Sequence, residues 1–331
     1  MLDFWANIEC RIPKKDRHLP RFEQLWLQDD ESNQIVQNTW KYTKGDIGNK
    51  LKDTLNQLHS WGKAKYGDIP RKINEIQKDL QHQKDKISDT TTQMTIKDKE
   101  KLLDGLMKEE ELWWAQMAKV NWLKAGDKNS KFFHIASQRK RKNTIKFIQD
   151  KDGTSWSDVD KISNTFIDYF NTIFETSNPI CMQHSIDVVK DRIKQDDFDY
   201  LQKEFSAAEV FEAIKQMKST AAPGPDGLHA LFYQTYWDVI GSDISHYVLE
   251  ILNHNGDPGN INHTFLCLIP KVKDPKVPSD FRPIALCNVI FKIITKTIAN
   301  RLKKILPNII SPQQSAFLPE KAYFRQHYSC L

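Results

Sequence analysis

The sequence predicts an α+β fold that is predominantly helical, and this prediction rests on three observations. Apolar residues recur every three or four positions across much of 31–123, which is typical of helices that bury one side. Two short runs, 144–156 and 264–269, show alternating or continuous apolar residues beside turn-forming residues, as strands do. With 331 residues, of which 39% are hydrophobic, the chain is long enough for a real core in one or two domains.

Residues 1–30 are expected to form an irregular N-terminal segment, and 31–143 a helical connector that is a helical hairpin or coiled coil. Gly67 and Pro70 break the first helical run, and the Thr-rich stretch 88–95 is expected to form the turn before a second long helix. The apolar positions at helical spacing before the break are Leu51, Leu55, Leu58 and Trp61.

The segment 144–204 is expected to hold a small β-hairpin, one helix and a polar linker. Ser157 precedes Asp160 by three residues and Ser206 precedes Glu209 by three, so each pair is spaced as a capping box that begins a helix. The boundary between the mainly helical front and the mixed rear is expected between residues 115 and 145.

The segment 205–318 combines the apolar strand 264–269, a basic proline-containing loop that leads to Arg282, and a helix over 288–306 that Asn288 is expected to cap. The apolar stripe of that helix is formed by Val289, Ile293, Ile294, Ile298, Leu302 and Ile305. Its remaining positions carry the basic residues Lys292, Lys296, Arg301, Lys303 and Lys304.

Positive charge is concentrated in two blocks, although the formal net charge is only +5. Residues 119–146 contain nine Lys or Arg against one Asp, and residues 264–306 contain nine against two Asp. Because each neutralised phosphate releases condensed counterions, such blocks favour a polyanionic partner, with a nucleic acid as the natural candidate.

Several classes of protein are excluded or disfavoured by the sequence. The five cysteines include no CxxC pair, so neither a zinc site nor a disulfide framework is indicated. The apolar runs are too short to span a bilayer, and no targeting signal is visible. We expect an intracellular protein of the nucleus or cytoplasm that does not associate with a membrane, and the sequence leaves its oligomeric state open.

The segment 121–134 interleaves aromatic and basic residues and is followed by the basic run 139–142. Aromatic rings can stack on unpaired bases while cations follow the backbone, as in RNA or single-strand binding. Burial of Trp122, Phe132 and Phe133 in a core is an equally good interpretation, and the sequence leaves both open.

The motif PGPDG at 223–227 predicts a rigid turn, and it lacks the Gly-Lys-Ser/Thr of a Walker loop. Arg282, on a loop at a strand edge, could grip a triphosphate together with Lys271, because a guanidinium fork matches phosphate oxygens. An ordinary solvated surface loop is the alternative for these two residues.

The ordered series PGPDG (223–227), LIPK (268–271) and FRPIALCN (281–288) resembles the opening of LINE-type, or non-LTR, retrotransposon reverse transcriptases, particularly those of plants. ANRL at 299–302 and QQSAF at 313–317 continue the series. Upstream segments, including 121–134, resemble the connector between the endonuclease and the polymerase of these elements, so the resemblance covers residues 20 to 318.

The resemblance implies a right-handed polymerase in which 205–318 is an incomplete reverse transcriptase domain, comprising the fingers and the start of the palm. Lys271 and Arg282 would lie near the phosphates of the incoming nucleotide, and an RNA template and DNA primer would be the partners. The residues expected to bind nucleic acid are Lys124, Lys128, Lys131, Arg139, Lys140, Arg141, Lys142, Lys292, Lys296, Arg301, Lys303 and Lys304.

Polymerases of this family use Mg²⁺ held by palm aspartates. Residues 319–331 diverge from the family pattern, and the chain has no Tyr-Ala-Asp-Asp, so we expect a fragment truncated before the catalytic motifs. No catalytic residue, metal ligand or bound cofactor is assigned to it, and by itself it is expected to be inactive. The alternatives are a non-catalytic RNA- or DNA-binding protein and a helical protein-interaction module.

Overall fold

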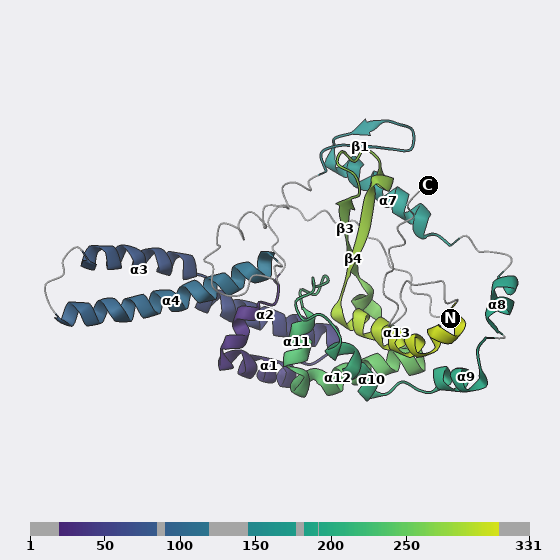
Figure 1. Ribbon diagram of the computed structural model, residues 1–331, viewed down its shortest axis with the longest axis horizontal. Coiled ribbons are helices and arrows are strands. Elements are labelled where there is room, and N and C mark those ends of the chain that lie inside the picture. The colour runs from purple at the N-terminus through teal and green to yellow at the C-terminus, as the bar shows by residue number, and fades with distance from the viewer. Residues whose placement is uncertain (1–19, 85–89, 119–144, 177–181, 191, 311–331) are drawn as a thin grey trace, which may run out of the picture.

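The computed structural model describes residues 20–84, 90–118, 145–176, 182–190 and 192–310, which are mostly helical (Figure 1). Strands in this part of the chain form two small antiparallel sheets of two strands each. The predicted α+β class with predominant helix is therefore confirmed. The predicted domain boundaries remain predictions.

The elements follow one another in three stretches. The first contains the 3-10 helix η1 (Gln24–Gln28), α1 (Asp30–Tyr42), α2 (Ile47–Tyr66), α3 (Ile69–Lys84) and α4 (Thr90–Ala118). The second contains β1 (Ile148–Gln149), β2 (Ser155–Trp156), α7 (Val159–Phe174), α8 (Gln183–Lys190), α9 (Gln195–Gln202) and α10 (Ala207–Lys215). The third contains α11 (Ala230–Thr235), α12 (Trp237–His254), η2 (Gly259–Asn262), β3 (Thr264–Pro270), η3 (Pro278–Asp280), β4 (Phe281–Cys287) and α13 (Val289–Ile309).

A helical hairpin of α3 and α4 projects from the rest of the molecule (Figure 1). At its base, Leu25 of η1 is buried with Ile69 and Ile73 of α3, against apolar residues of α4. The predicted turn at 88–95 is wrong for 90–95, since α4 begins at Thr90. Threonine lowers helix propensity only slightly, so packing of α4 on α3 outweighs the preference of this stretch for a turn.

One large core joins α1 and α2 to α10, α11, α12 and α13. Phe22 and Trp26, from the segment predicted as irregular, are fully buried in it, and Phe22 also packs edge-on against Phe232 with ring centroids 5.4 Å apart. The hydroxyls of Ser32 and Tyr236 are hydrogen-bonded at 3.0 Å, which links α1 to the start of α12. Helices assigned to the connector therefore share a core with helices that follow residue 205.

The predicted hairpin at 144–156 is present as β1 and β2, but the helix after it begins differently from the prediction. Asp158, not Ser157, is the N-cap of α7, and its carboxylate accepts the backbone N–H of Lys161. The second predicted capping box, Ser206 with Glu209 at the start of α10, is confirmed. Asp158 and Ser157 are both good capping residues, so spacing alone could not choose between them.

A second hairpin, β3 with β4, rises from the start of α13 toward α7 (Figure 1). The sequence predicted β3 but treated the residues up to Arg282 as a loop; β4 spans Phe281–Cys287 and includes Pro283 opposite Leu268. Proline is tolerated because each strand of a two-stranded sheet has an unpaired edge. At the far end, Phe281 is buried among Ile148, Phe166 and Phe170.

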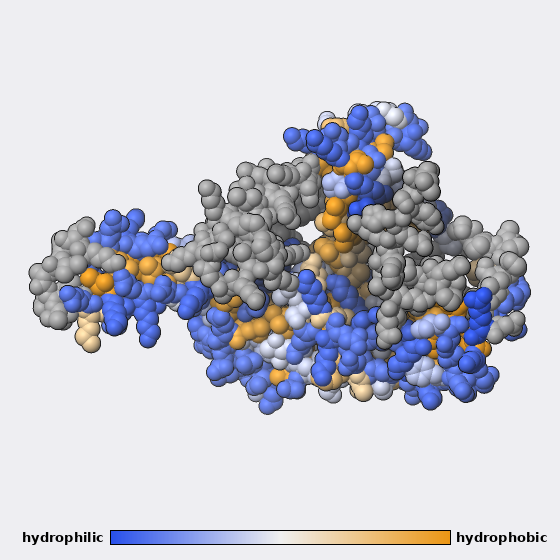
Figure 2. Space-filling view, in the orientation of Figure 1, coloured by the Kyte–Doolittle hydropathy of each residue, from blue (hydrophilic) through white to orange (hydrophobic). Residues whose placement is uncertain are grey.

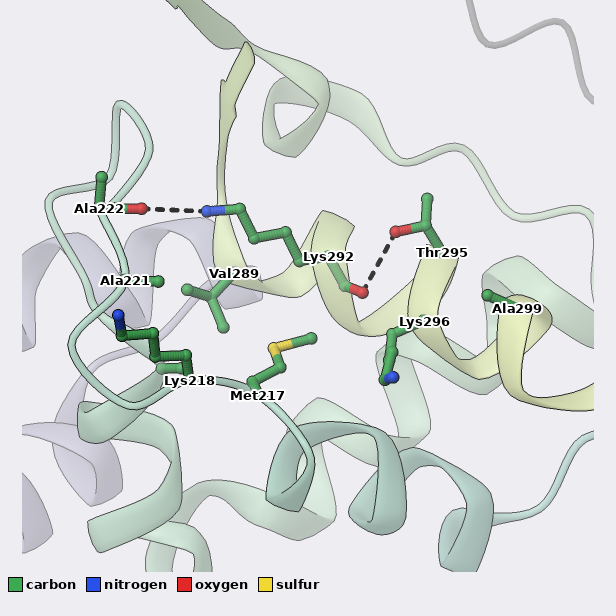
Figure 3. A pocket seen from close by; sticks show the side chains of 10 residues that line it. Met217, Lys218, Ala221, Ala222, Val289, Lys292, Thr295, Lys296 and Ala299 are labelled. Carbon is green, nitrogen blue, oxygen red and sulfur yellow. Dashed lines mark hydrogen bonds between the residues drawn. The ribbon is translucent and has the colours of Figure 1, made fainter. Parts of the chain in front are cut away.

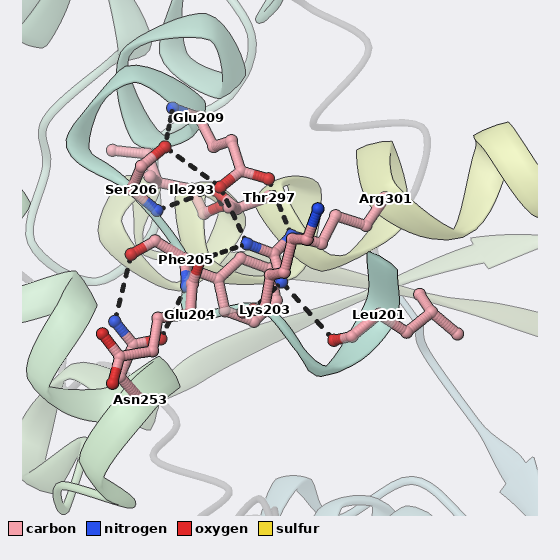
Figure 4. A network of polar contacts seen from close by, with 10 residues as sticks. All are labelled: Leu201, Lys203, Glu204, Phe205, Ser206, Glu209, Asn253, Ile293, Thr297 and Arg301. Atoms are coloured by element: carbon pink, nitrogen blue, oxygen red, sulfur yellow. Dashed lines mark hydrogen bonds and ion pairs between the residues drawn. The ribbon is translucent and has the colours of Figure 1, made fainter. Parts of the chain in front are cut away.

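Arg301 of α13 is buried and joins three segments (Figure 4). Its Nε and Nη2 donate to the two carboxylate oxygens of Glu209 at 2.7 and 2.9 Å, and Nη1 and Nη2 also donate to the backbone carbonyls of Leu201, Lys203 and Glu204. These five bonds use all five N–H groups of the guanidinium. The ion pair with Arg301 holds the pKa of Glu209 down at about 2.

Two predictions for α13 are thereby corrected. Arg301 was predicted to bind nucleic acid, but it is 4% exposed and has no N–H left for a phosphate. Leu302 was predicted on the apolar stripe, yet it is 40% exposed. Adjacent helical positions point about 100° apart, so burying Arg301 turns Leu302 toward solvent.

Substituting Arg301→Met should lower the free energy of unfolding by about 3 kcal/mol, the low end for a buried ion pair that loses one partner. The low end applies because the side chain of Glu209 is 32% exposed, so water can replace part of the lost interaction. Urea denaturation followed by circular dichroism measures this. Lys303→Met, an exposed position on the same helix, is the control and should change stability by less than about 0.5 kcal/mol. Equal effects of the two substitutions would contradict the assigned role of Arg301.

Candidate nucleic-acid interface

The PGPDG turn lies directly against the start of α13. A Cβ added at Gly224 would collide with the backbone of Asn288, so only glycine permits this close approach. Gly227 adopts φ of +74°, and its carbonyl accepts the N–H of Phe22 at 3.0 Å. The turn is thus held on one side by α13 and on the other by the segment that leads into η1.

Asn288 is the residue that fixes the turn, and the prediction that it caps the helix is right in position but not in its hydrogen bond. It occupies the N-cap position of α13, but its side chain makes no capping hydrogen bond. Its Oδ1 instead accepts the N–H of Asp226 at 3.1 Å, while Nδ2 donates to the carbonyl of Ile261 at 3.0 Å. The side chain therefore provides hydrogen-bond partners for two backbone groups that belong to segments far apart in the sequence.

Asp226 is the titratable group of the turn. Burial of its carboxyl group raises its pKa to about 6, although the N–H of Leu228 and the charge of Lys292 favour the ionised form. The neighbouring hydroxyl of Tyr233 is fully buried, and burial raises its pKa well above the ordinary value. This carboxyl therefore changes charge in mildly acidic solution rather than near pH 4.

A cavity of about 480 Å³ lies between the loop that precedes the turn and α13 (Figure 3). Its apolar wall is formed by Met217, Ala221, Ala222, Ala230, Val289 and Ala299. Its polar residues are Lys218, Lys292, Thr295 and Lys296. Lys292 Nζ donates to the carbonyl of Ala222 at 3.0 Å, which holds the loop against the helix.

Three lysines form one row along α13, which we call the lysine row: Lys292, Lys296 and Lys303. Their spacings of four and seven residues put them on the same side of a helix of 3.6 residues per turn. Burial lowers the pKa of Lys296, and the nearby charge of Lys303 lowers it further. Like charges held together in this way favour an anion beside them.

In the described part of the chain, the lysines that line the cavity are not among the residues that form ion pairs. Lys50, Lys65, Arg71, Lys99 and Arg301 have carboxylate partners there. Among these described residues, no carboxylate forms an ion pair with Lys218, Lys296 or Lys303.

The other basic residues predicted on this helix lie elsewhere. Lys304 faces α9, where Nζ lies 5.0 Å from the centre of the Tyr200 ring and a hydrogen bond with the Tyr200 hydroxyl raises its pKa. The N–H groups of Arg301 are all hydrogen-bonded within the protein, as Figure 4 shows. Lys218, which lines the cavity from the opposite side, was missed, although its place five residues before PGPDG could have signalled it.

Lys271 and Arg282, the predicted nucleotide-binding pair, lie at the far end of the β3–β4 hairpin. Lys271 Nζ donates to the carbonyl of Ser279 at 2.7 Å, and Arg282 is exposed opposite Ile269. At about 3.3 Å per residue, β4 separates Arg282 from α13 by roughly 20 Å. The structure thus brings these two residues together but not to the lysine row.

Seven predicted nucleic-acid contacts fall outside the described residues: Lys124, Lys128, Lys131, Arg139, Lys140, Arg141 and Lys142. Within the described ranges, no group of three or more His, Cys, Asp or Glu side chains could hold a metal ion. None of the helices described there is both long enough and apolar enough to cross a membrane.

No protein-family model matches the chain. Over 205 residues, which are 60% of the chain, it is 28% identical to the "Transposon TX1 uncharacterized 149 kDa protein" of Xenopus laevis. The chain spans only 15% of the length of that protein. The comparison therefore gives a distant similarity to a transposon-encoded protein.

Asp226→Asn should stabilise the protein at pH 8 and have little effect at pH 4. Asp226 titrates near pH 6 when folded and near 3.8 when unfolded, so wild-type stability is full below about pH 4 and falls as pH rises through 6. A pKa difference of about two units corresponds to a loss of about 3 kcal/mol of folding stability at high pH, and a neutral amide at this position avoids that loss. Urea denaturation at pH 4, 6 and 8 measures the difference; an effect of equal size at all three would contradict the assigned titration.

Proposed function

We propose that the chain is part of a LINE-type retrotransposon reverse transcriptase of the plant type, contributing the fingers and the first elements of the palm. In this proposal it binds an RNA template and a DNA primer and does not perform catalysis alone. The motif series PGPDG, LIPK and FRPIALCN supports the family, and similarity to a transposon-encoded protein of Xenopus laevis supports a transposon origin.

The observation that carries the binding proposal is the lysine row beside the PGPDG turn. Burial and the nearby charge of Lys303 lower the pKa of Lys296, and neither lysine has a carboxylate partner among the described residues, so a phosphate chain would relieve their repulsion. Amines on a helix surface contact phosphates without reading bases, which suits a template of any sequence. The residues proposed to contact RNA are those of this row and the basic residues of 124–142.

Lys271 and Arg282 are proposed to contact the phosphates of the incoming nucleotide. Both lie at the end of a hairpin whose exposed side carries Phe265, Ile269 and Ile284, and Figure 2 shows apolar atoms along it. A guanidinium and an ammonium at one strand end can grip a triphosphate. The apolar side would pack on other parts of the polymerase.

Mg²⁺ would supply the chemistry of the complete polymerase by activating the primer hydroxyl and clamping the triphosphate. The residues described here do not provide a fitting set of carboxylates, and the sequence has no Tyr-Ala-Asp-Asp. The reaction would therefore need a set of carboxylates that the described residues do not supply.

Binding of single-stranded RNA should weaken steeply as salt rises. The double variant Lys296→Gln, Lys303→Gln should reduce the slope of log affinity against log salt by about 1.4, since each lost phosphate contact contributes about 0.7 on a single strand. Fluorescence anisotropy from low to physiological salt measures both quantities.

The control is Lys304→Gln, which removes one positive charge from the side of α13 that faces Tyr200 and is compared with half of the effect of the double variant. It should leave most of the slope in place. Affinity that does not change with salt, or a loss per removed charge that is equal in the control and the double variant, would refute the proposed surface.

Primer extension should be undetectable with the purified chain in Mg²⁺ or Mn²⁺, because the sequence has no Tyr-Ala-Asp-Asp and the described residues form no carboxylate cluster for the metals. Incorporation of labelled nucleotide on a primed RNA template is the measurement. Template-dependent extension by the pure protein would show that the chain is a polymerase by itself.

A further inference from the structure

We propose that the cavity beside the PGPDG turn takes up one unpaired nucleobase of a single-stranded RNA whose backbone lies on the lysine row. The inference rests on the proposed RNA binding and deepens it, because it assigns a base-binding cavity to a surface so far argued from phosphate contacts alone. The observations that carry it are the shape, lining and charge of the cavity (Figure 3).

The size and wall of the cavity suit an aromatic ring. Its volume of about 480 Å³ lies within the usual range of small-molecule sites, roughly 300–1,000 Å³. Met217 and Val289 line it together with four alanines, so most of the wall is apolar. A thioether packs favourably against ring edges, and small alanines leave room for a flat group.

The rim of the cavity suits a phosphate. Lys218 stands on the loop side, Lys292 and Lys296 stand on the helix side, and none of the lining residues that the structure describes is acidic. A ligand with a flat apolar part and an attached anion matches both features. A nucleotide has this combination, with the base inside and its phosphate among the lysines.

A strand fits better than a free nucleotide because the positive charge continues beyond the cavity. Lys303 lies eleven residues after Lys292 on the same side of α13, a distance of about 16 Å along the helix. The charge of Lys303 acts on Lys296, which lines the cavity, so the row is continuous. One nucleotide would leave Lys303 unused, whereas a chain of phosphates would engage the whole row.

The polar groups of the cavity indicate little preference among bases. The carbonyl of Ala222 already accepts from Lys292, and the hydroxyl of Thr295 donates to backbone carbonyls of its own helix. Few groups therefore remain to read a base edge, as in proteins that bind single strands without sequence preference. The inserted base would be recognised as a flat ring.

The test compares a uridine oligonucleotide of RNA with an oligonucleotide of the same length and backbone that lacks bases. We expect the base-bearing strand to bind wild-type protein about five-fold more tightly or better, the low end for one base contact. Ala299→Leu, which fills the cavity without changing charge, should abolish this difference while salt-dependent binding of the abasic strand continues. Leu302→Phe adds bulk on the exposed side of α13 and should preserve the difference.

Each other outcome decides against a specific claim. Equal, salt-dependent affinity for both strands would overturn the base-binding cavity and leave the proposed RNA surface intact. No affinity for either strand would overturn both. If adenosine monophosphate binds tightly and an oligonucleotide does not displace it, the claim that the ligand is a strand would be overturned. If an acidic peptide at equal concentration displaces the RNA, the claim that the cavity selects a nucleotide would be overturned. If Ala299→Leu does not fold, the comparison of the two strands on wild-type protein decides alone.

Discussion

The side-chain amide of Asn288 connects three segments on which the candidate interface depends. It receives the N–H of Asp226 and donates to the carbonyl of Ile261, so the PGPDG turn, η2 and the start of α13 meet at one buried residue. An unpaired buried amide or carbonyl is costly, which makes this arrangement strongly preferred over a separated turn. Glycine at 224 allows the approach, and the cavity exists because loop and helix are held at this separation.

The basic residues of α13 divide according to how their charge is compensated. Arg301 is buried, and its full set of hydrogen bonds with Glu209 and three carbonyls offsets its desolvation. Lys304 interacts with Tyr200, whereas Lys296 and Lys303 repel each other. That repulsion does not stabilise the fold. The lysine row is therefore the part of the helix that we propose binds an anionic partner.

The hairpin separates two basic regions of different character. Lys271 and Arg282 stand at the end that is anchored by Phe281 in the core of α7, while the lysine row begins where β4 ends. A ligand as small as one nucleotide could not contact both regions across the length of β4. Their separation suits two ligands, a polymer on α13 and a compact anion at the end of the hairpin. In the proposed function these are the template and the incoming nucleotide.

The sequence by itself determined the helical periodicity, the Ser206 capping box, β3 and the short β1–β2 hairpin, because each depends on residues within a few positions of one another. The order of its motifs also supplied the proposed family. Only the tertiary structure decided that Asn288 bridges segments instead of making a capping hydrogen bond, and that Pro283 lies within a strand. It also decided that Lys218 lines the same cavity as Lys292 and Lys296, while Arg301 is buried in an internal network. Asn288 has partners 27 and 62 residues away, and the carboxylate partner of Arg301 is 92 residues away, so local spacing carries no information about them.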